Sequence, residues 1–296
     1  MSRSSDAVRY LETLPQMLSV LHKVTPETEK YGFHLHEPLE VVVALSDNLA
    51  CRYEGGVCPL PAPCVLLLDS MTMHYIFRRA AGPADRYVVY FRPECAAGLS
   101  LPTLHLLSCF YLRTGLGPVV LPLTDTELDE LLPLLERLQA GLAVSPHGDS
   151  AAALLQTTEC RLLLGQLLVF LNRLSLRCGV EKPFPTDPGL LEAAFAVRDY
   201  IRDHYAEPLS AGVLAQQAYL GKTRLYEVFC QVFGVTVGEY LTRYRMTRAK
   251  DLLLNSDDSI QLIAEKVGYA SASTFTRAFH TRTGHSPAQY RRRQGE

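Results

Sequence analysis

The pattern of hydrophobic and polar residues changes along the chain, from short strand-like runs to longer helical periods. Between about residues 30 and 95, runs of Val, Ile, Leu, Tyr and Phe alternate with Gly- and Pro-rich clusters such as "EGGVCPLPAP" and "AAGPAD". β-Branched and aromatic residues favour strands, and Gly and Pro favour the turns between them. The expected strands are 40–45, 64–69, 74–79 and 86–91. Short strands at this spacing predict a small antiparallel barrel or sandwich, and we expect a barrel.

From residue 124 onward, hydrophobic residues recur at helical intervals. The segment 124–142, "TDTELDELLPLLERLQAGL", opens with Thr and Asp, which cap helices, and then carries leucines three and four positions apart. Segment 151–178 is a second long helix with two apolar faces. One face carries Leu155, Leu162 and Val169, and another carries Leu164, Leu168 and Leu171. Because such a helix must be covered on two sides, we expect the strand domain on one side and a second subunit on the other.

The segment 179–189, "GVEKPFPTDPG", is the best linker in the chain, with three prolines and two glycines. Every later segment has a helical pattern. We therefore predict a multi-domain α+β protein. Its parts are an antiparallel β-barrel domain with an N-terminal arm at 1–123, a helical dimerisation segment at 124–178, the linker, and an all-α domain at 190–296.

The composition fits a soluble globular protein, with 48% hydrophobic and 20% charged residues. No stretch reaches the roughly 18 uninterrupted apolar residues of a membrane span, and the N-terminus has no apolar signal-peptide core. We therefore expect a cytoplasmic protein without membrane contact. The eight cysteines include no C-x-x-C pair and lie mostly in apolar runs, which is typical of buried free thiols.

The net charge of −2 conceals an uneven distribution. Residues 220–293 contain 12 Lys and Arg against 6 Asp and Glu, a charge of +6, and the other residues together carry −8. A basic C-terminal block on an acidic body indicates a polyanionic partner at that end of the molecule.

The C-terminal part contains an internal repeat that aligns residues 215–245 with 264–293. At an offset of 50, the matched pairs are Leu225 and Phe275, Phe229 and Phe279, Gly234 and Gly284, Tyr240 and Tyr290, and Arg243 and Arg293. The leading alanines, Ala215 and Ala264, are 49 residues apart, so the second copy has one extra residue, which we place in a turn. Each copy predicts a helix-turn-helix in which only a narrow apolar stripe of the second helix is buried.

The second copy and the segment before it, "YLTRYRMTRAKDLLLNSDDSIQLIAEKVGYASASTFTRAFHTRTGHSPAQYRRR", resemble the C-terminal signature of the AraC/XylS family of bacterial transcription regulators. The resemblance is dense over about 200–293. It implies two helix-turn-helix units that read successive major grooves of double-stranded DNA, about 34 Å apart. This sequence departs from the pattern in its first copy, where Tyr219 replaces the helix-ending Gly268 and "GVTVGEY" replaces the Ser-Pro of "GHSPAQY".

The resemblance also assigns candidate DNA-contacting residues. The family's base-reading positions correspond here to Thr223, Tyr226 and Glu227 in the first unit, and to Ala272, Ser273, Thr276 and Arg277 in the second. Arg277 is the best candidate for a bidentate contact to guanine. Phosphate contacts, which position the protein without reading sequence, are expected from Lys222, Arg224, Arg243, Arg245, Arg248 and Lys250.

Histidines and a carboxylate recur in the strand region. His34, His36 and Glu40 have H-x-H-x-x-x-E spacing, and His74 follows in a later strand. Residues 34 and 36 of one strand point the same way, so the four side chains can converge, and such a set is competent to bind a metal. The arrangement resembles the cupin metal motif, and AraC-type regulators commonly carry a cupin-like effector domain.

Three interpretations of these residues remain open: a metalloenzyme site, a polar effector pocket, and a purely structural hydrogen-bonded cluster. The glycines of the full metallocupin pattern are missing, because residue 47 is Asp and "PAPC" stands in place of Pro-x-Gly. We therefore favour an effector pocket and expect neither a metal nor another cofactor. Its expected residues are His34, His36, Glu40, Tyr53, His74 and Tyr90.

The sequence as a whole predicts a homodimeric regulator, not an enzyme, that binds DNA and is controlled by a small-molecule effector. RNA polymerase is a further expected partner. The alternatives are a regulator controlled by a protein partner that docks on the N-terminal domain, and a metal-dependent cupin enzyme with a regulatory DNA-binding domain.

Overall fold

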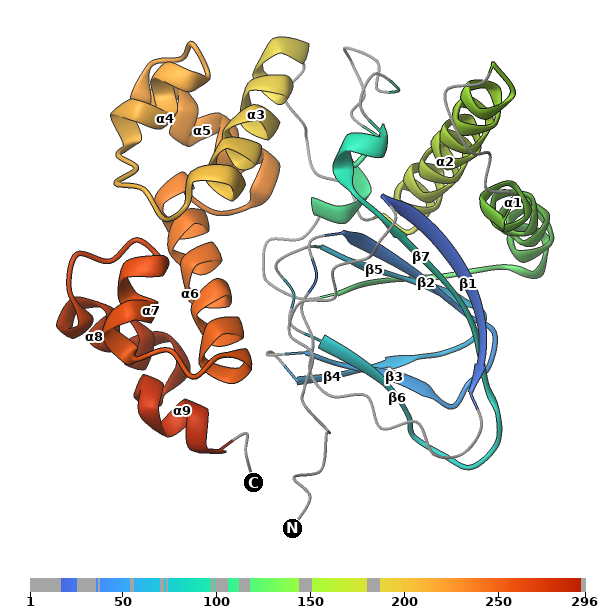
Figure 1. Ribbon diagram of the computed structural model, residues 1–296. Helices are drawn as coiled ribbons and strands as arrows, with labels where there is room; N and C mark the ends of the chain where they lie inside the picture. Colours follow the sequence, from blue (N-terminus) through green and yellow to red (C-terminus); the bar gives the residue numbers. More distant parts are fainter. Residues whose placement is uncertain are drawn as a thin grey trace.

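The computed structural model describes residues 17–25, 36, 38–53, 56–69, 72, 74–96, 99, 106–111, 118–143, 151–179 and 187–293. Strands form the N-terminal part and helices the C-terminal part, with two further helices beside the strands (Figure 1). The described strands are β1 (Leu18–Thr25), β2 (Leu39–Ala44), β3 (Leu49–Tyr53), β4 (Gly56–Leu60), β5 (Cys64–Leu68), β6 (His74–Arg78), β7 (Ala84–Phe91) and β8 (Val119–Pro122).

The strands form two antiparallel sheets. The larger has the order β1-β7-β2-β5-β8 and the smaller the order β4-β3-β6. The four strands expected from the sequence are confirmed as β2, β5, β6 and β7. The other four are additional, and β1 in particular pairs with β7 along its whole length, from Leu18 opposite Phe91 to Thr25 opposite Ala84.

The central strand β2 of the larger sheet is buried on both faces. All six residues of β2 are buried. Val42 and Ala44 belong to a core shared with the smaller sheet, which also contains Leu49, Cys51 and Leu60. Val41 and Val43, which point the opposite way because side chains alternate along a strand, belong to a second core that includes leucines of the neighbouring helices.

The prediction of a closed barrel is wrong. Among the described residues, no strand of one sheet is hydrogen-bonded to a strand of the other, and β1, β8, β4 and β6 are edges. The chain crosses from one sheet to the other through short connections at 45–48, 61–63 and 79–83. The two sheets therefore stack face to face across an apolar core, which is the sandwich alternative.

Two long helices cover the outer face of the larger sheet. They are α1 (Asp125–Ala143) and α2 (Ala151–Arg177), as expected from their periodicity. In the α1 capping box, Glu127 N–H donates to Thr124 Oγ1 over 3.3 Å and Thr124 N–H donates to Glu127 Oε2 over 2.8 Å. Two short 3₁₀ helices, η1 (Pro93–Ala96) and η2 (Ser108–Tyr111), lie near α2.

Helix α2 has one buried and one exposed apolar face. Leu164, Leu168 and Leu171 are fully buried, whereas Leu155, Leu162, Val169 and Leu176 are 72%, 56%, 46% and 57% exposed. By length and composition alone α2 could cross a membrane, a test that core helices of soluble proteins also pass. Its buried face belongs to the core of the N-terminal part.

The C-terminal part consists of helices. They are α3 (Pro188–His204), α4 (Ala211–Gln217), α5 (Lys222–Phe233), α6 (Val237–Asn255), α7 (Ile260–Lys266), α8 (Ala272–Thr283) and α9 (Pro287–Arg293). Helix α6 runs between two groups, with α4 and α5 near its start and α7 and α8 near its end (Figure 1). The second group has a core of its own, which contains Ile263, Ala264, Phe275 and Phe279.

Candidate nucleic-acid interface and buried polar cluster

The two helix-turn-helix units have the same turn geometry at their first helix. Tyr219 has φ of 52° and Gly268 has φ of 81°, so both are left-handed. The residue after each donates a backbone hydrogen bond to the crossing alanine, Leu220 to Ala215 O over 3.0 Å and Tyr269 to Ala264 O over 2.9 Å. This is the pattern of a Schellman-type helix end, and Tyr219 therefore reproduces the backbone that Gly268 provides.

The extra residue of the second copy lies in the turn, as predicted. The first turn runs from Ala218 to Gly221 and the second from Val267 to Ser271. Ser271 Oγ accepts from Thr274 N–H over 3.2 Å at the start of α8, whereas Gly221 gives α5 no side-chain cap. The departure "GVTVGEY" is also accommodated, because Thr236 Oγ1 caps α6 by accepting from Glu239 N–H over 3.2 Å.

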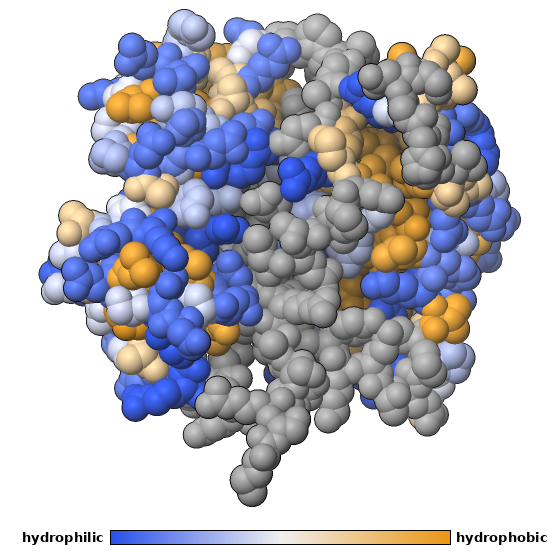
Figure 2. Space-filling view, viewed as in Figure 1, coloured by the Kyte–Doolittle hydropathy of each residue, from blue (hydrophilic) through white to orange (hydrophobic). Residues whose placement is uncertain are grey.

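Each second helix buries one stripe and exposes the rest. In α5, Leu225 and Phe229 are fully buried, and in α8 Phe275 and Phe279 are fully buried. The predicted base-reading positions lie away from this stripe: Thr223, Tyr226, Glu227, Ser273 and Arg277 are exposed, and Ala272 and Thr276 are partly exposed. Figure 2 shows that the visible surface of this domain is mostly hydrophilic, in keeping with a polar partner.

The predicted phosphate-contacting residues fall into two groups. Lys222 and Arg224 are exposed near the start of α5, and Arg224 Nη1 lies 3.1 Å from Glu227 Oε2. The predicted phosphate-contacting residues of α6 instead make contacts within the protein. Arg245 donates to the backbone oxygens of Tyr205 and Glu207 over 2.8 and 2.7 Å.

Two other candidate residues of α6, Arg248 and Lys250, are also packed against the domain. Lys250 is only 8% exposed, and Arg248 packs its guanidinium over the ring of Tyr205 at 5.8 Å. The sequence could not show these contacts, because an arginine or lysine looks the same in the sequence whether its side chain faces solvent or packs against the domain. Arg245, Arg248 and Lys250 therefore have contacts within the domain, and their contact with DNA phosphates stays a prediction.

Glu239 joins the second unit to α6. Arg282 of α8 donates to both of its carboxylate oxygens, over 2.9 and 2.6 Å, and Arg243 donates over 2.7 Å. The hydrogen bonds from Arg282, followed by those from Arg243, hold the pKa of Glu239 at about 2. Arg282 therefore connects the end of α8 to the start of α6, whereas Arg243, a predicted phosphate contact, pairs with Glu239 within α6.

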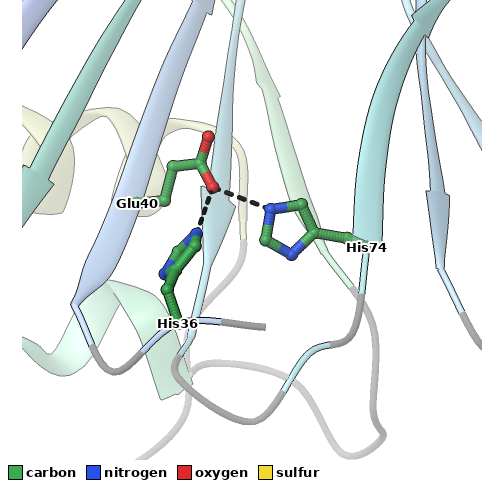
Figure 3. Close-up of side chains that lie close together, drawn as sticks. All are labelled: His36, Glu40 and His74. Carbon is green, nitrogen blue, oxygen red and sulfur yellow. Dashed lines mark hydrogen bonds and ion pairs between the residues drawn. The ribbon is translucent and has the colours of Figure 1, made fainter. Parts of the chain in front are cut away.

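A second polar group lies between the two sheets of the N-terminal part. Glu40 Oε2 accepts from His36 Nε2 over 2.8 Å and from His74 Nε2 over 2.7 Å (Figure 3). All three residues are 1% exposed or less. His36 immediately precedes β2, Glu40 lies in β2, and His74 begins β6, so the group connects the larger sheet to the smaller.

The charges of this cluster are mutually dependent. Burial by itself raises the pKa of Glu40, but the charge of His74 and the hydrogen bonds from both histidines hold it well below its usual range. Burial lowers the pKa of His74, but the charge and hydrogen bond of Glu40 raise it above its usual value. The cluster therefore favours an ionised carboxylate beside a cation.

The other predicted pocket residues lie near the cluster or outside the described part. Tyr90 pairs with Glu40 across β7 and β2, and its ring meets that of His36 edge-on at 5.1 Å. Tyr53 is opposite His74 in the pairing of β3 and β6. His34 lies outside the described residues.

Sequence reasoning missed the contact between the two parts of the molecule. Tyr111 of η2 packs edge-on against Phe195 of α3 at 5.6 Å and Phe233 of α5 at 5.1 Å. Arg198 of α3, which is 5% exposed, donates to the Tyr111 hydroxyl over 3.0 Å and to Asp199 Oδ1 over 2.9 Å. No local pattern marks Tyr111, because its partners are far away in the sequence.

The comparisons with known proteins agree with this geometry. Residues 214–293 match a family described as a helix-turn-helix domain. The HTH-type transcriptional activator RhaS of Escherichia fergusonii is 31% identical over 168 residues, which are 57% of this chain and 54% of that protein. YijO, an uncharacterized HTH-type transcriptional regulator of Escherichia coli, is 34% identical over 97 residues, which are 33% of this chain and 34% of that protein.

Among solved structures, the C-terminal domain of AraT, a response regulator from Geobacillus stearothermophilus, is 33% identical with a TM-score of 0.34. The alignment covers 34% of this chain and 84% of that one. The chain spans about half the length of RhaS and about a third of YijO. Repeated units joined by α6 define a double helix-turn-helix protein. By this domain the chain belongs to the AraC/XylS family of transcription regulators.

Proposed function

We propose that the protein regulates transcription by binding double-stranded DNA through α5 and α8, under the control of a small-molecule effector in its N-terminal domain. The observation that carries the proposal is the repeated pairing of a buried stripe with a solvent-facing polar surface on these two helices. The stripe consists of Leu225 and Phe229 in α5 and of Phe275 and Phe279 in α8. A helix held in this way can enter a major groove without losing core packing.

The proposed division of labour follows the side-chain positions. Thr223, Tyr226 and Glu227 of α5, with Ala272, Ser273, Thr276 and Arg277 of α8, are assigned to base edges. Lys222 and Arg224 are assigned to phosphates, and Glu227 is available to a base only when its ion pair with Arg224 opens. Arg277 is assigned to guanine, since its planar guanidinium can donate two parallel hydrogen bonds.

The proposed effector site is the buried polar cluster with Tyr53 and Tyr90. Support comes from the position of the cluster between two sheets and from the contacts that η2, in the same N-terminal part, makes with the DNA-binding helices. Ser108 Oγ of η2 donates to Asn172 Oδ1 of α2 over 2.7 Å, and at the other end of η2 Tyr111 contacts α3 and α5. An effector that shifts η2 would therefore act on both α2 and the first helix-turn-helix unit.

We assign homodimerisation to the exposed face of α2. Leu155, Leu162, Val169 and Leu176 are seven residues apart and form one apolar stripe, as at a helix–helix seam. Two copies joined there would bind two operator half-sites. RNA polymerase is proposed as a partner of the DNA-bound dimer.

In vitro selection of bound DNA by the purified full-length protein tests the proposal. Use of both helices predicts a preference spread over more than about ten base pairs per subunit, and affinity that falls steeply with salt. Arg277→Lys retains the charge but loses the bidentate geometry, so it should relax the preference at one base pair and cost about 1–3 kcal/mol there.

Arg137→Lys in α1 is the matched control, because Arg137 is an exposed arginine outside the proposed interface. It should leave both affinity and base preference unchanged. A preference confined to about five base pairs, or unchanged selectivity in Arg277→Lys, would contradict the use of α8 for base reading.

A further inference from the structure

We propose that Cys51 and Cys58 form a modification site, at which a low-molecular-weight disulfide converts their two thiols into a reversible cross-strand disulfide. The two residues lie on neighbouring strands of the smaller sheet, β3 and β4, and the register places them directly opposite each other (Figure 1). Both are free thiols in this structure. The proposal goes beyond the proposed function, because it concerns neither DNA nor an effector.

The first argument is the distance that the register imposes. Residues directly opposite each other in an antiparallel pair have Cα atoms about 4.5–5.5 Å apart and Cβ atoms about 4.5–5.5 Å apart. Their side chains point to the same face of the sheet. A disulfide spans Cα separations of about 4.4–6.8 Å and Cβ separations of about 3.5–4.5 Å. Cys51 and Cys58 therefore meet the first condition and reach the second by a small closing movement of the two strands.

The second argument is that the register selects this pair over the neighbouring thiol of Cys64. Burial, and then the charge of a Cys58 thiolate, raise the pKa of Cys64 to about 12, so Cys58 lies near Cys64 as well. Cys64, however, belongs to β5 of the larger sheet. Stacked sheets lie about 10 Å apart, whereas adjacent strands of one sheet lie about 4.8 Å apart. The partner on the adjacent strand, Cys51, is therefore favoured.

The third argument is the difference in exposure between the two thiols. Cys51 is fully buried in the core between the sheets, whereas Cys58 is partly exposed. Burial, followed by the charges of Glu40 and Cys58, raises the pKa of the Cys51 thiol. Because the thiolate is the form that attacks a disulfide, Cys58 is the thiol that meets the oxidant first. Cys51 then resolves the mixed disulfide.

The reaction consists of two exchange steps. In the first, the Cys58 thiolate attacks one sulfur of the small disulfide RSSR, a bond forms between that sulfur and Cys58 Sγ, and RS⁻ leaves. In the second, Cys51 loses its proton and its Sγ attacks Cys58 Sγ, which releases the other RS⁻. The two protein thiols together lose two electrons and two protons, and RSSR takes them up as two RSH.

The new bond would tie β3 to β4 by a covalent link in addition to the backbone ladder. In the reduced chain each thiol makes only a weak contact, since Cys51 Sγ and Cys58 Sγ each lie 3.8 Å from the backbone oxygen of the following residue. Exposed disulfides are the labile and regulatory ones. Because Cys58 is partly exposed, a reductant can reach the bond, so the link would form and open with the redox state of the surroundings.

The test uses the full-length protein, fully reduced and then exposed to oxidised glutathione in the absence of DNA. Trypsin cuts after Arg52, which separates the two cysteines into the peptides 31–52 and 53–78. After the remaining thiols are blocked, we expect mass spectrometry to find these two peptides linked in most of the chains. Tandem spectra should locate the bond on Cys51 and Cys58, and dithiothreitol should release the two peptides.

Variants separate the roles of the two thiols. Cys51→Ser should stop the reaction at the first step, with one glutathione held on Cys58. Cys58→Ser should leave Cys51 reduced, because the oxidant does not reach a fully buried thiol. Cys230→Ser is the matched control, since Cys230 is another partly exposed cysteine but lies on α5. It should form the linked peptides as the unmodified chain does.

Three outcomes would overturn the proposal. They are a Cys58 that stays a thiol or a mixed disulfide in the unmodified chain, a bond between Cys58 and Cys64, which would leave peptide 53–78 unlinked, and linked peptides retained by Cys58→Ser. The peptide map of the unmodified chain needs no variant, so a misfolded variant cannot leave the question open. A chain that forms the disulfide but selects no DNA would refute only the proposed function.

Discussion

Tyr219 and Gly268 occupy the same place in the two helix-turn-helix units, and both have a left-handed backbone. For a residue with a Cβ this conformation costs about 1–2 kcal/mol. Tyr219 is 97% exposed, so its side chain recovers little of this cost by packing inside the domain. An aromatic ring fully exposed at the turn before α5 is also available to a partner of the first unit.

Opposite substitutions at these two positions should have opposite effects on stability. Tyr219→Gly removes the cost of holding a residue with a Cβ in the left-handed conformation, and it should stabilise the protein by about 0.5–1 kcal/mol. Gly268→Ala should destabilise it by about 2–4 kcal/mol, because a Cβ there would lie 2.8 Å from Tyr205 O and 2.9 Å from Ala206 O. Urea unfolding followed by far-UV circular dichroism measures both, since the chain has no tryptophan to report by fluorescence.

Gly238→Ala supplies the control for this pair. Gly238 lies in α6, and a Cβ at this position would meet nothing within 4 Å. The same substitution should therefore stabilise the protein, by about 0.5–1 kcal/mol through helix propensity. A Gly268→Ala protein as stable as Gly238→Ala would show that the turn can shift to accept a side chain.

At the scale of elements, the contact of Glu239 with Arg282 and Arg243 fixes α8 relative to α6. The folded pKa of about 2 lies below the usual value of 4.5. An acid with a depressed pKa contributes stability that is fully present above about pH 4.5 and is lost as the pH falls towards 2. Because the Glu239 side chain is 32% exposed, solvent screening limits this contribution to about 1 kcal/mol.

Glu239→Gln should accordingly lower the free energy of unfolding by about 1 kcal/mol near neutral pH. The difference from the unmodified chain should shrink between about pH 4.5 and pH 2 and then vanish. Glu192→Gln, at an exposed position on α3, is the matched control, because it removes a glutamate carboxylate outside this contact. Urea unfolding at a series of pH values makes the comparison, and a difference that is constant with pH would refute the role of the charge.

The exposed stripe of α2 gives a second prediction at this scale. Leu162→Glu places a charge in the middle of the proposed dimer interface, where Leu162 is 56% exposed in the single chain. The cost of burying it should raise the dimer dissociation constant at least about a hundredfold. Sedimentation equilibrium should then report the mass of one chain over concentrations at which the unmodified protein is dimeric.

Leu262→Glu is matched to this variant in chemistry. Leu262 is 39% exposed, but it lies in α7, outside the proposed dimer interface. It should leave the mass unchanged. A monomeric unmodified protein, or equal dissociation in both variants, would contradict the assignment of α2 as the dimer interface.

At the scale of the whole molecule, η2 connects the sheets to the DNA-binding helices. Tyr111 lies among Phe195, Phe233 and Arg198, and the hydrophobic core continues from the outer face of the larger sheet into the first helix-turn-helix unit. Burial raises the pKa of the Tyr111 hydroxyl, although the nearby charge of Arg198 lowers it in part. The second unit has a separate core, so η2 contacts the first unit directly and lies apart from the core of the second.

Tyr111→Ala should uncouple the two parts of the molecule. It removes a buried ring and one acceptor of the buried Arg198, a loss of about 3–5 kcal/mol. Calorimetry should show the unfolding of the two parts as separate transitions. Tyr111→Phe keeps the ring and loses only the hydroxyl, so it should cost about 1 kcal/mol and leave the transitions together. Separate transitions in the unmodified chain would contradict the coupling.

The helix-turn-helix repeat could be read from the sequence because its determinants are local. Ala264, Gly268, Phe275 and Phe279 lie within sixteen consecutive residues, and helix period and turn chemistry together fix their geometry. The exposure of Thr223 and Arg277 follows from the same period, since positions beside a buried stripe point away from it. The strands 40–45 and 86–91 were predictable for the same reason, from alternation and flanking turn residues.

Other features depended on contacts between distant segments. Whether eight strands close into a barrel depends on hydrogen bonds between the edge strands. A high content of β-branched residues predicts strands but not which edges pair, and among the described strands the edges of the two sheets are not paired with each other. Arg245 and Lys250 have the same formal charge as a phosphate-binding residue, but Arg245 donates to the backbone oxygen of Tyr205 and Lys250 is buried. Only burial could separate the two roles.

The sequence by itself determined the repeat, the polarity of its recognition helices and the residue types able to form a metal or effector site. The tertiary structure alone decided which of these meet. Glu40 and His74 are 34 residues apart in the sequence, and Tyr111 and Arg198 are 87 apart. Their contacts exist because two sheets stack and because Tyr111 of η2 packs against both α3 and α5. The hydrophobic periodicity of the sequence does not predict such contacts, since they depend on the folding of the whole chain.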